Sequence, residues 1–309
     1  MIIFEIIVTI ILPMFVLIIS GTALNYKFNL NLNTLSNILI YFFLPIVCFF
    51  NIYNTSFEKA IIINIILYVV LYNVSLIVLT ILYGKRLNLT FEESATFKNG
   101  AVLSNSANYG IPVSNLVFKT DPVGTSVQVI IAVIQNVLTY TWGFLNASSV
   151  NGKISKEQIK KMLKIPIIYG LLLAVIMKLF NLPIPSVLEI PLKQIDDGFI
   201  AIALLTLGAQ ISFKGMKQVD KVVVNAIIIR VLFSQVISLL ILFSLGITGL
   251  LAKALFLSSS FPSNRSAALI ALEYNNVPDK AAAIVVYTTI LSPFTVAINI
   301  ILGNLIFGA

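Results

Sequence analysis

Two short polar segments interrupt stretches that are otherwise apolar, and their residue types are suited to binding an anion. The first is SANYGIP, at residues 106–112, and the second is SSSFPSNRSA, at residues 258–267. Each contains a proline, which ends a helix, beside side chains that form hydrogen bonds. A helix that restarts after such a break presents backbone N–H groups and partial positive charge to a ligand. The amides of Asn108 and Asn264 would add donors that hold a carboxylate without burying a permanent charge.

The candidate substrate-binding residues lie in these two segments and at an amide pair in the apolar segment that follows the first break. The full set is Asn108, Tyr109, Gly110, Pro112, Pro262, Ser263, Asn264, Arg265, Gln135 and Asn136. Tyr109 either caps the pocket or packs in the core. The amide pair either lines a wet site or forms hydrogen bonds between helices. For each break, the alternative is a simple proline kink.

Charged residues inside apolar segments are candidates for function, because a charge is costly to bury in a membrane. Arg265 either binds a substrate carboxylate in a bidentate fork, or faces a wet cavity or an internal carboxylate. The carboxylates considered for that internal pair are Glu273, Asp196 and Asp197. The last two are also the candidates for coupling to a proton or cation, with an exposed re-entry loop as the alternative. Arg230 either snorkels to the cytoplasmic face or has a function inside the membrane.

The elements that carry these residues are predicted to be membrane-spanning helices. Apolar residues make up 59% of the 309-residue chain and charged residues 10%, against about 45–50% and about 25% in soluble domains. So much apolar surface requires lipid as the solvent, and one spanning helix needs about 20 residues. The apolar runs and the breaks between them predict ten segments, at residues 4–23, 35–53, 60–83, 96–118, 122–146, 165–180, 188–210, 222–245, 248–272 and 279–307.

Lysine and arginine residues predict the orientation of these helices in the bilayer. They concentrate in the loops after the first, third, fifth, seventh and ninth segments, with the largest group at residues 153–164. Loops rich in Lys and Arg stay in the cytoplasm, so we expect a multi-pass protein of the cell membrane with both termini outside the cytoplasm. The net charge of +8 then reflects topology and not nucleic-acid binding. Binding of a partner or of anionic lipid is the alternative for the lysine-rich loop.

The order of the segments predicts an inverted repeat. Residues 1–148 hold five segments, residues 149–164 form the cytoplasmic lysine-rich loop, and residues 165–309 hold five more. Because each half has an odd number of segments, the second half is inserted upside down relative to the first. A shift of 156 residues aligns the two broken segments without a gap and pairs Asn108 with Asn264. We therefore expect an all-α membrane protein in which two broken helices, the fourth and the ninth, cross.

The composition excludes several kinds of chemistry. The chain contains no histidine and one cysteine, Cys48, so a His-centred catalytic site, an intrachain disulfide and a Cys-based metal site are impossible. No nucleotide-binding motif is present, and we expect neither a metal nor a cofactor. An enzyme is therefore disfavoured. A secondary transporter of a small organic anion is predicted, with a channel or a membrane receptor as the alternatives.

The chain contains several short motifs, which are Asn108 with Gly110-Ile111-Pro112, Pro262-Ser263-Asn264, Leu44-Pro45 and Leu207-Gly208-Ala209. In their placement they resemble those of the auxin efflux carrier family, which includes malate or malonate permease-type transporters in the bile-acid/arsenite superfamily. The resemblance implies a scaffold domain, a transport domain with two crossing broken helices, and an elevator-like movement of an organic anion held near the crossing. It also implies a homodimer formed through scaffold helices. Arg265 departs from the small or apolar residue expected at its position.

Overall fold

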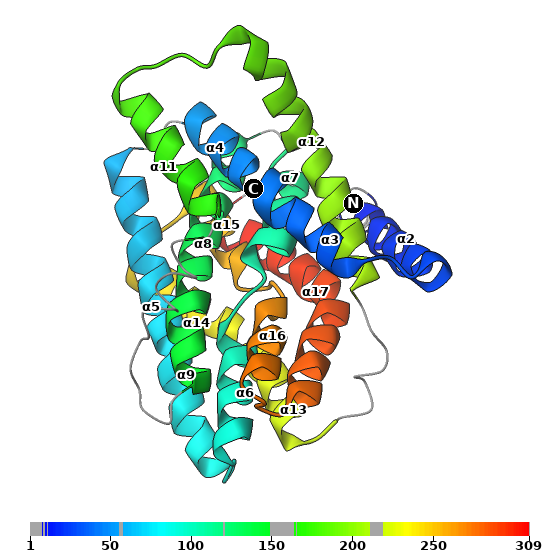
Figure 1. The fold of residues 1–309 in the computed structure, drawn as a ribbon. Helices are drawn as coiled ribbons and strands as arrows, with labels where there is room; N and C mark the ends of the chain where they lie inside the picture. The colour runs from blue at the N-terminus through cyan, green and yellow to red at the C-terminus, as the bar shows by residue number, and fades with distance from the viewer. Residues whose placement is uncertain are drawn as a thin grey trace.

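The structure, a computed structural model, describes residues 8, 10, 12–55, 58–119, 121–148, 164, 166–210 and 219–308 (Figure 1). Within these residues the chain folds into helices and short π-helical turns, and the predicted all-α class is confirmed. In chain order the elements are α2 (Leu12–Phe28), α3 (Leu32–Ile38), η2 (Leu39–Phe43), α4 (Leu44–Asn54), α5 (Lys59–Arg86), α6 (Phe91–Val102), η3 (Ser106–Gly110), α7 (Ile111–Val117), α8 (Pro122–Leu138), η4 (Thr139–Gly143), α9 (Phe144–Ser148), α11 (Pro166–Leu179), α12 (Ser186–Ala209), α13 (Lys221–Ile228), η6 (Ile229–Phe233), α14 (Ser234–Ser244), α15 (Gly249–Ser258), α16 (Arg265–Glu273) and α17 (Pro278–Phe307).

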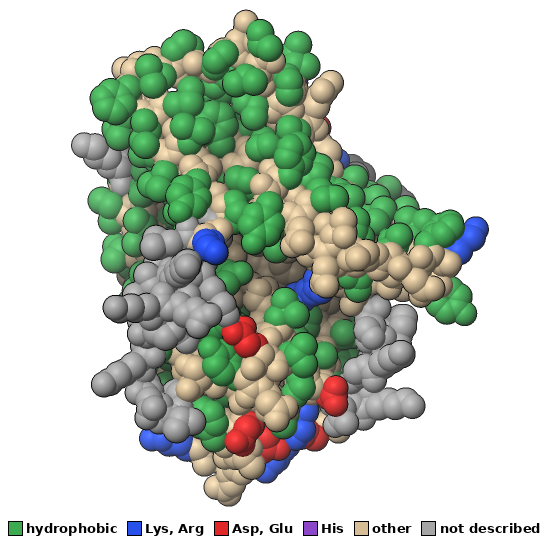
Figure 2. Space-filling view, in the orientation of Figure 1, with side chains coloured by type: hydrophobic (Ala, Val, Ile, Leu, Met, Phe, Trp, Pro, Cys, Tyr) green, Lys and Arg blue, Asp and Glu red, His purple; other side chains and the backbone are tan. Residues whose placement is uncertain are grey.

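The helices suit a lipid environment in both length and surface. In the described part of the chain, the helical stretches long and apolar enough to cross a membrane are Leu32–Asn54, Ala60–Arg86, Pro122–Ser148, Lys221–Ser244 and Pro278–Phe307. Figure 2 shows hydrophobic side chains over the upper part of one face, while many acidic and basic side chains gather at its lower end. Exposed apolar side chains of this extent need lipid around them, and the charged end needs water.

A helix or a pair of helices lies at each predicted segment. Most bounds agree within a few residues, although the start of the first segment lies outside the described residues. The segment at 96–118 is split into α6 and α7, and the segment at 248–272 into α15 and α16. The repeat of five and five segments stays a prediction. The lysine-rich loop, apart from Lys164, also lies outside the described residues.

One set of helices, which we call the scaffold group, consists of α2, α3, α4, α11 and α12 with the turn η2. In it, α2 packs along α12 and α4 packs along α11. Gly21 and Gly208 allow the first of these contacts. A Cβ atom at Gly21 would lie 1.9 Å from the Leu205 carbonyl oxygen, and one at Gly208 would lie 1.8 Å from the Ile18 carbonyl oxygen. Small residues let membrane helices approach this closely.

The remaining helices, α5 to α9 and α13 to α17 with their π-helical turns, form a second set that we call the crossover group. Its two broken segments pack against each other and against unbroken helices. α15 contacts α8 and α17, and α6 contacts α5 and α13. Figure 1 shows α6, α13 and α16 reaching the lower end of the molecule together. The scaffold group contacts this set mainly through α4 and α12, which pack on α8 and α7.

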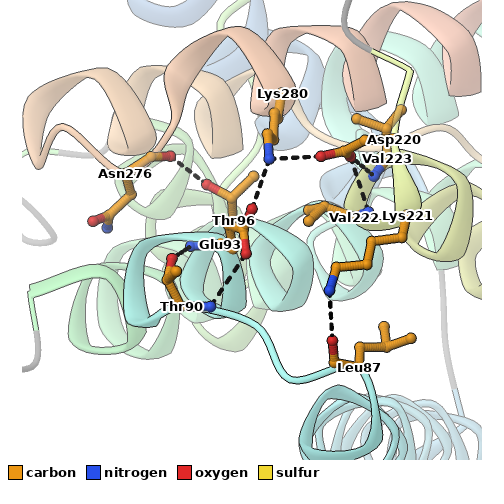
Figure 3. Close-up of polar contacts among 10 residues, drawn as sticks. All are labelled: Leu87, Thr90, Glu93, Thr96, Asp220, Lys221, Val222, Val223, Asn276 and Lys280. Carbon is orange, nitrogen blue, oxygen red and sulfur yellow. Dashed lines mark hydrogen bonds and ion pairs between the residues drawn. The ribbon is translucent and has the colours of Figure 1, made fainter.

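Charged side chains join the starts of three helices at this lower end (Figure 3). The Lys280 Nζ of α17 lies 2.7 Å from the Glu93 Oε1 of α6 and 2.6 Å from the Asp220 Oδ2 at the start of α13. The hydrogen bond from Lys280 keeps the pKa of the Glu93 carboxyl below its ordinary value. Burial would raise the pKa of Asp220, but Lys280 and the backbone N–H groups of Val222 and Val223 outweigh burial and lower it. The three residues form an ion cluster that ties the helix starts together.

Candidate functional site

The two broken segments cross and hydrogen-bond to each other. Ser104 and Ser263 form an isolated antiparallel bridge. The Asn105 N–H donates to the Pro262 carbonyl, and the Asn264 N–H donates to the Leu103 carbonyl, both with N–O distances of 2.8 Å. The two interruptions are therefore a single structure and not two independent proline kinks. It brings four half-helix ends together, two N-terminal and two C-terminal.

Protein groups satisfy the polar backbone that these interruptions expose. The Gln128 Nε2 of α8 donates to the Ser106 carbonyl over 2.9 Å, and the Ser263 N–H donates to the Thr288 Oγ1 of α17 over 3.1 Å. An unsatisfied backbone group inside a membrane costs several kcal/mol. These partners explain how polar segments of this kind persist within spanning helices.

The N-terminal half-helix ends face a pocket of about 360 Å³, which we call the crossover pocket. After the first break, η3 and α7 together run from Ser106 to Val117, and after the second α16 starts at Arg265. The first turns of such helices hold N–H groups that have no acceptor in their own helix. Asn264 caps α16 by accepting from the Ser266 N–H over 2.9 Å. The polar side chains around the pocket from these elements and α8 are Asn105, Asn108, Asn136, Asn264 and Ser266.

Other walls of the crossover pocket come from both groups, and η4, α9 and α16 of the crossover group contribute Tyr140, Phe144 and Ile270. Ile40, Tyr41 and Leu44 line it from η2 and α4, and Pro166 and Ile167 line it from α11. In the described part of the chain, the pocket is also lined by one cation, Lys164, and one carboxylate, Glu273. It therefore lies between the scaffold group and the crossover group.

Three of the predicted binding residues reach this pocket: Asn108, Asn136 and Asn264. The Oδ1 atom of Asn108 is buried and has no hydrogen-bond partner among the described residues, so this oxygen is free to accept a hydrogen bond from a ligand. The Asn136 Nδ2 donates to the Ala132 carbonyl one turn back, over 2.8 Å, which leaves its second amide hydrogen and its oxygen for other partners. The structure therefore brings amides of both breaks and of α8 around one space.

Other predicted residues lie behind the pocket, in the packing between the breaks. The Tyr109 ring is fully buried edge-to-face against Phe261, with ring centroids 5.7 Å apart. Gly110 is needed for this approach, because a Cβ atom there would lie 2.6 Å from the Phe261 ring and 2.5 Å from the Gln128 Nε2. Pro112 and Ser263 are buried, as is Pro262. Tyr109 therefore follows the core-packing alternative and not the capping one.

Gln135 and Arg265 both contact protein groups outside the crossover pocket. The Gln135 Nε2 donates to the Asn73 Oδ1 of α5 over 3.0 Å, in the interhelical contact given as the alternative for it. The Arg265 guanidinium donates to the Ser36 Oγ of α3 over 2.6 Å, and not to Glu273 or to the aspartates of α12. Arg265 thus connects the crossover group to the scaffold group. It does not line the pocket itself.

Asp196 and Asp197 lie in the continuous helix α12, so the re-entry loop considered for them is wrong. The Asp196 Oδ1 accepts from the Asn51 Nδ2 over 2.7 Å, and Asp197 is exposed. Asp196 lines a separate polar pocket of about 230 Å³ together with Asn51 and Lys119. The structure thus places the predicted coupling carboxylates away from the crossover pocket. Among the described residues no cluster of acidic or cysteine side chains is suited to hold a metal ion.

The C-terminal half-helix ends meet on the buried side chain of Arg230, which does not snorkel to the surface as the sequence permits. The side chain is 1% exposed. Its Nε donates to the Phe261 carbonyl over 2.9 Å, and its Nη2 donates to the Ser259 carbonyl over 3.2 Å. Its Nη1 lies 3.4 Å from the carbonyl oxygens of both Ala101 and Val102, at the end of α6. The unsatisfied carbonyls of the crossing hold this side chain inside, because it reaches both breaks at once.

Asn105 lines the crossover pocket and was not among the residues that the sequence singled out. It directly precedes η3 as Asn264 directly precedes α16, and the bridge between Ser104 and Ser263 relates the same two positions. The matching positions are therefore 159 residues apart, and Asn105, not Asn108, corresponds to Asn264. The ungapped shift of 156 residues is wrong at the crossing. The presence of an asparagine three residues before Asn108 was the available signal.

Comparison with known proteins agrees with this architecture. A family described as membrane transport protein matches residues 2–300 of the chain. A relative from Methanothermobacter thermautotrophicus, named an uncharacterized transporter, is 24% identical over 213 residues, which cover 68% of this chain and 68% of the relative. Since the family match covers nearly the whole chain, the protein is a membrane transporter that belongs to the membrane transport protein family, the auxin efflux carrier and malate permease type.

Proposed function

We propose that this membrane transporter carries a small organic anion, which binds in the crossover pocket. The observation that carries the proposal is that the N-terminal ends of both half-helices line one pocket. Helix N-termini bear partial positive charge and offer N–H groups to an anion. The amides of Asn108, Asn136 and Asn264 can donate further hydrogen bonds to the same ligand.

The charges and the size of the pocket support a carboxylate as the ligand. Among the described lining residues, Lys164 and Glu273 carry opposite charges that balance, and the two helix ends add a positive potential. A volume of about 360 Å³ lies at the small end of ligand pockets, which hold about 300–1,000 Å³. Apolar walls from Leu44 and Ile167 suit the carbon skeleton of such an anion. The proposed substrate class is therefore small mono- and dicarboxylates.

Transport is proposed to occur by an elevator movement of the crossover group against the scaffold group. The pocket lies between the two groups, and few polar contacts join them within the residues that the structure describes. One is the hydrogen bond from Arg265 to Ser36, and another joins the hydroxyls of Thr55 and Ser126 over 2.5 Å. Hydroxyl contacts of this kind can exchange when one group slides along the other. The ligand would then move with the crossover group.

The binding site is tested by flux of a radiolabelled dicarboxylate into proteoliposomes. Asn264→Ala removes a pocket amide and the cap of α16, and we expect it to abolish saturable flux. Asn31→Ala is the matched control, because Asn31 caps α3 with hydrogen bonds of 3.1 Å and 3.0 Å but lies outside the pocket. Either cap loss costs about 1 kcal/mol of stability. Full transport by Asn264→Ala, or equal loss in both variants, would refute the site.

The elevator movement is tested by a cross-link between the two groups. Cys48 is the single cysteine of the chain, so Cys48→Ala provides a background in which Thr55→Cys and Ser126→Cys are introduced together. Because the native hydroxyls lie 2.5 Å apart, the two thiols are close enough for a disulfide. Oxidation should stop flux and dithiothreitol should restore it, while either single cysteine variant should be unaffected. Undiminished flux through the oxidised double variant would exclude the movement.

A further inference from the structure

Arg230 differs from the other charged side chains in the described part of the chain, because it alone is fully buried, at 1% exposure. It lies in η6, within the helical stretch Lys221–Ser244 that is long enough to span a membrane. A π-helical turn inside a helix often marks a functional position. Its place in the span and its burial both call for an explanation, since an intramembrane cation is costly.

The partners of Arg230 are all neutral oxygen atoms. Carbonyls of the second break, at Ser259 and Phe261, accept from it, and so do the carbonyls of Ala101 and Val102 at the end of α6. The hydroxyl of Tyr72 on α5 lies 3.3 Å from its Nη2. The compensating negative charge is therefore the partial charge at the C-terminal ends of the half-helices, and not a carboxylate.

Such an oxygen cage is chemically the kind of site that holds a metal cation. In transporters with discontinuous helices, the half-helix C-terminal ends and the unwound carbonyls coordinate the coupling Na⁺ or H⁺. Here, the guanidinium occupies the space between the carbonyls of both breaks and uses their lone pairs. A mobile cation would have to displace a side chain that is covalently attached and hydrogen-bonded from all three nitrogens.

We propose that Arg230 is a tethered cation that permanently fills a monovalent-cation site at the crossing, so that anion transport needs no exchangeable Na⁺ or K⁺. The claim that transport needs no Na⁺ or K⁺ rests on the proposed anion transport. The claim that Arg230 fills a cation site does not, since it concerns only the oxygen atoms around the guanidinium. Arg230 is a positioning residue in this account: it holds the C-terminal ends of both half-helices and does not touch the proposed substrate.

The test restores the missing cation from solution. Wild type, Arg230→Ala, Arg230→Lys and Arg86→Ala are purified, and thermal unfolding is followed in choline, sodium, potassium or ethylguanidinium chloride at equal ionic strength. Arg86 is the control because it is an exposed arginine at the end of α5. We expect Arg230→Ala to melt lowest in choline and to gain about 5 °C in saturating ethylguanidinium or sodium. Wild type and Arg86→Ala should respond alike to all four salts.

Each outcome decides the proposal. If no cation raises the melting temperature of Arg230→Ala by more than it raises that of wild type, the tethered-cation role is overturned. Arg230 would then have a purely structural role. If Arg230→Ala cannot be purified, wild type decides: specific stabilisation by sodium or potassium would show an exchangeable site and contradict the proposal. Carboxylate flux in wild-type proteoliposomes should be equal in sodium and in choline. Flux that requires sodium overturns the proposal, whereas absence of any carboxylate flux defeats the proposed function and leaves the melting result standing.

Discussion

The two sides of the helix crossing are both formed by half-helix ends at the breaks, but one side is open to a pocket and the other is filled by a side chain. The N-terminal side opens on a pocket of about 360 Å³, and the Asn108 Oδ1 beside it has no partner among the described residues. The C-terminal side is closed around Arg230, whose three guanidinium nitrogens all reach oxygen atoms. On the first side polar groups face an open pocket, and on the second the Arg230 guanidinium occupies the space between the carbonyls.

This difference indicates how a pair of broken helices can favour a ligand of one charge over a ligand of the opposite charge. Each break creates a positive end and a negative end, and both ends attract opposite charge. A ligand from solution can satisfy only the end that the fold leaves open. In this transporter the positive ends are open and the negative ends are filled by the chain itself, which favours an anion as the exchangeable ligand.

The largest expected effect is on the closed side. Arg230→Ala leaves buried carbonyls of both breaks without their donor, and since each unsatisfied buried acceptor costs about 1–3 kcal/mol, we expect it to lower the free energy of unfolding by several times the cost of a single lost hydrogen bond. The exposed Arg86→Ala should change it by no more than about 0.5 kcal/mol. Unfolding in mixed detergent followed by circular dichroism measures both. Equal, small losses would show that the closed side is not stabilised by its cation.

A smaller effect is expected where the two breaks press together. Gly110→Ala places a Cβ atom 2.6 Å from the Phe261 ring, and overpacking of this kind costs about 1–3 kcal/mol. Gly84→Ala is the control, since its Cβ would meet Phe97 at an ordinary 3.5 Å, and alanine favours a helix by up to about 1 kcal/mol. The same unfolding measurement compares the two variants. A neutral Gly110→Ala would mean that the breaks are not closely packed.

The smallest effect is expected from the partly exposed ion cluster, which contrasts with the buried Arg230. Lys280→Ala should cost about 1 kcal/mol near neutral pH, as exposed ion pairs do. The folded-state pKa values of Glu93 and Asp220 are lowered, so their contribution is present above their ordinary pKa values, near 4, and is lost as the pH falls through the lowered ones. The stability difference between wild type and Lys280→Ala should therefore be constant from neutral pH to about 5 and shrink in stronger acid. A difference that grows in acid would contradict the assigned pairing.

The sequence predicts the helices and the crossing better than the residues that surround the pocket. Hydropathy and proline placement locate the helices because both reflect local requirements of a chain in lipid. The side chains that face the pocket depend on where each half-helix restarts. The 156-residue alignment paired Asn264 with Asn108 instead of Asn105, and so placed the restart of the first half-helix three residues, nearly one helical turn, too late.

The burial of the Arg230 side chain could not be predicted from the residues next to it in the sequence. An arginine at that depth has a stem long enough to reach water. The groups that hold it inside are the carbonyls of Val102 and Phe261, which lie 128 and 31 residues away. Similarly, near Asp196 and Asp197 the continuous helix α12 contacts Asn51 of α4 and Phe43 of η2, which a count of charged residues in the segment does not reveal.

The most direct test of the central claim, that the open N-terminal side binds an organic anion, is a thermal-shift screen of the purified transporter against small mono- and dicarboxylates. A ligand at about a hundred times its Kd stabilises by about 2.7 kcal/mol. We predict a saturable rise in melting temperature with at least one carboxylate, absent in Asn264→Ala and retained in Asn31→Ala. No rise with any carboxylate, an equal rise in Asn264→Ala, or an equal rise with the neutral amide of the same acid would contradict the account.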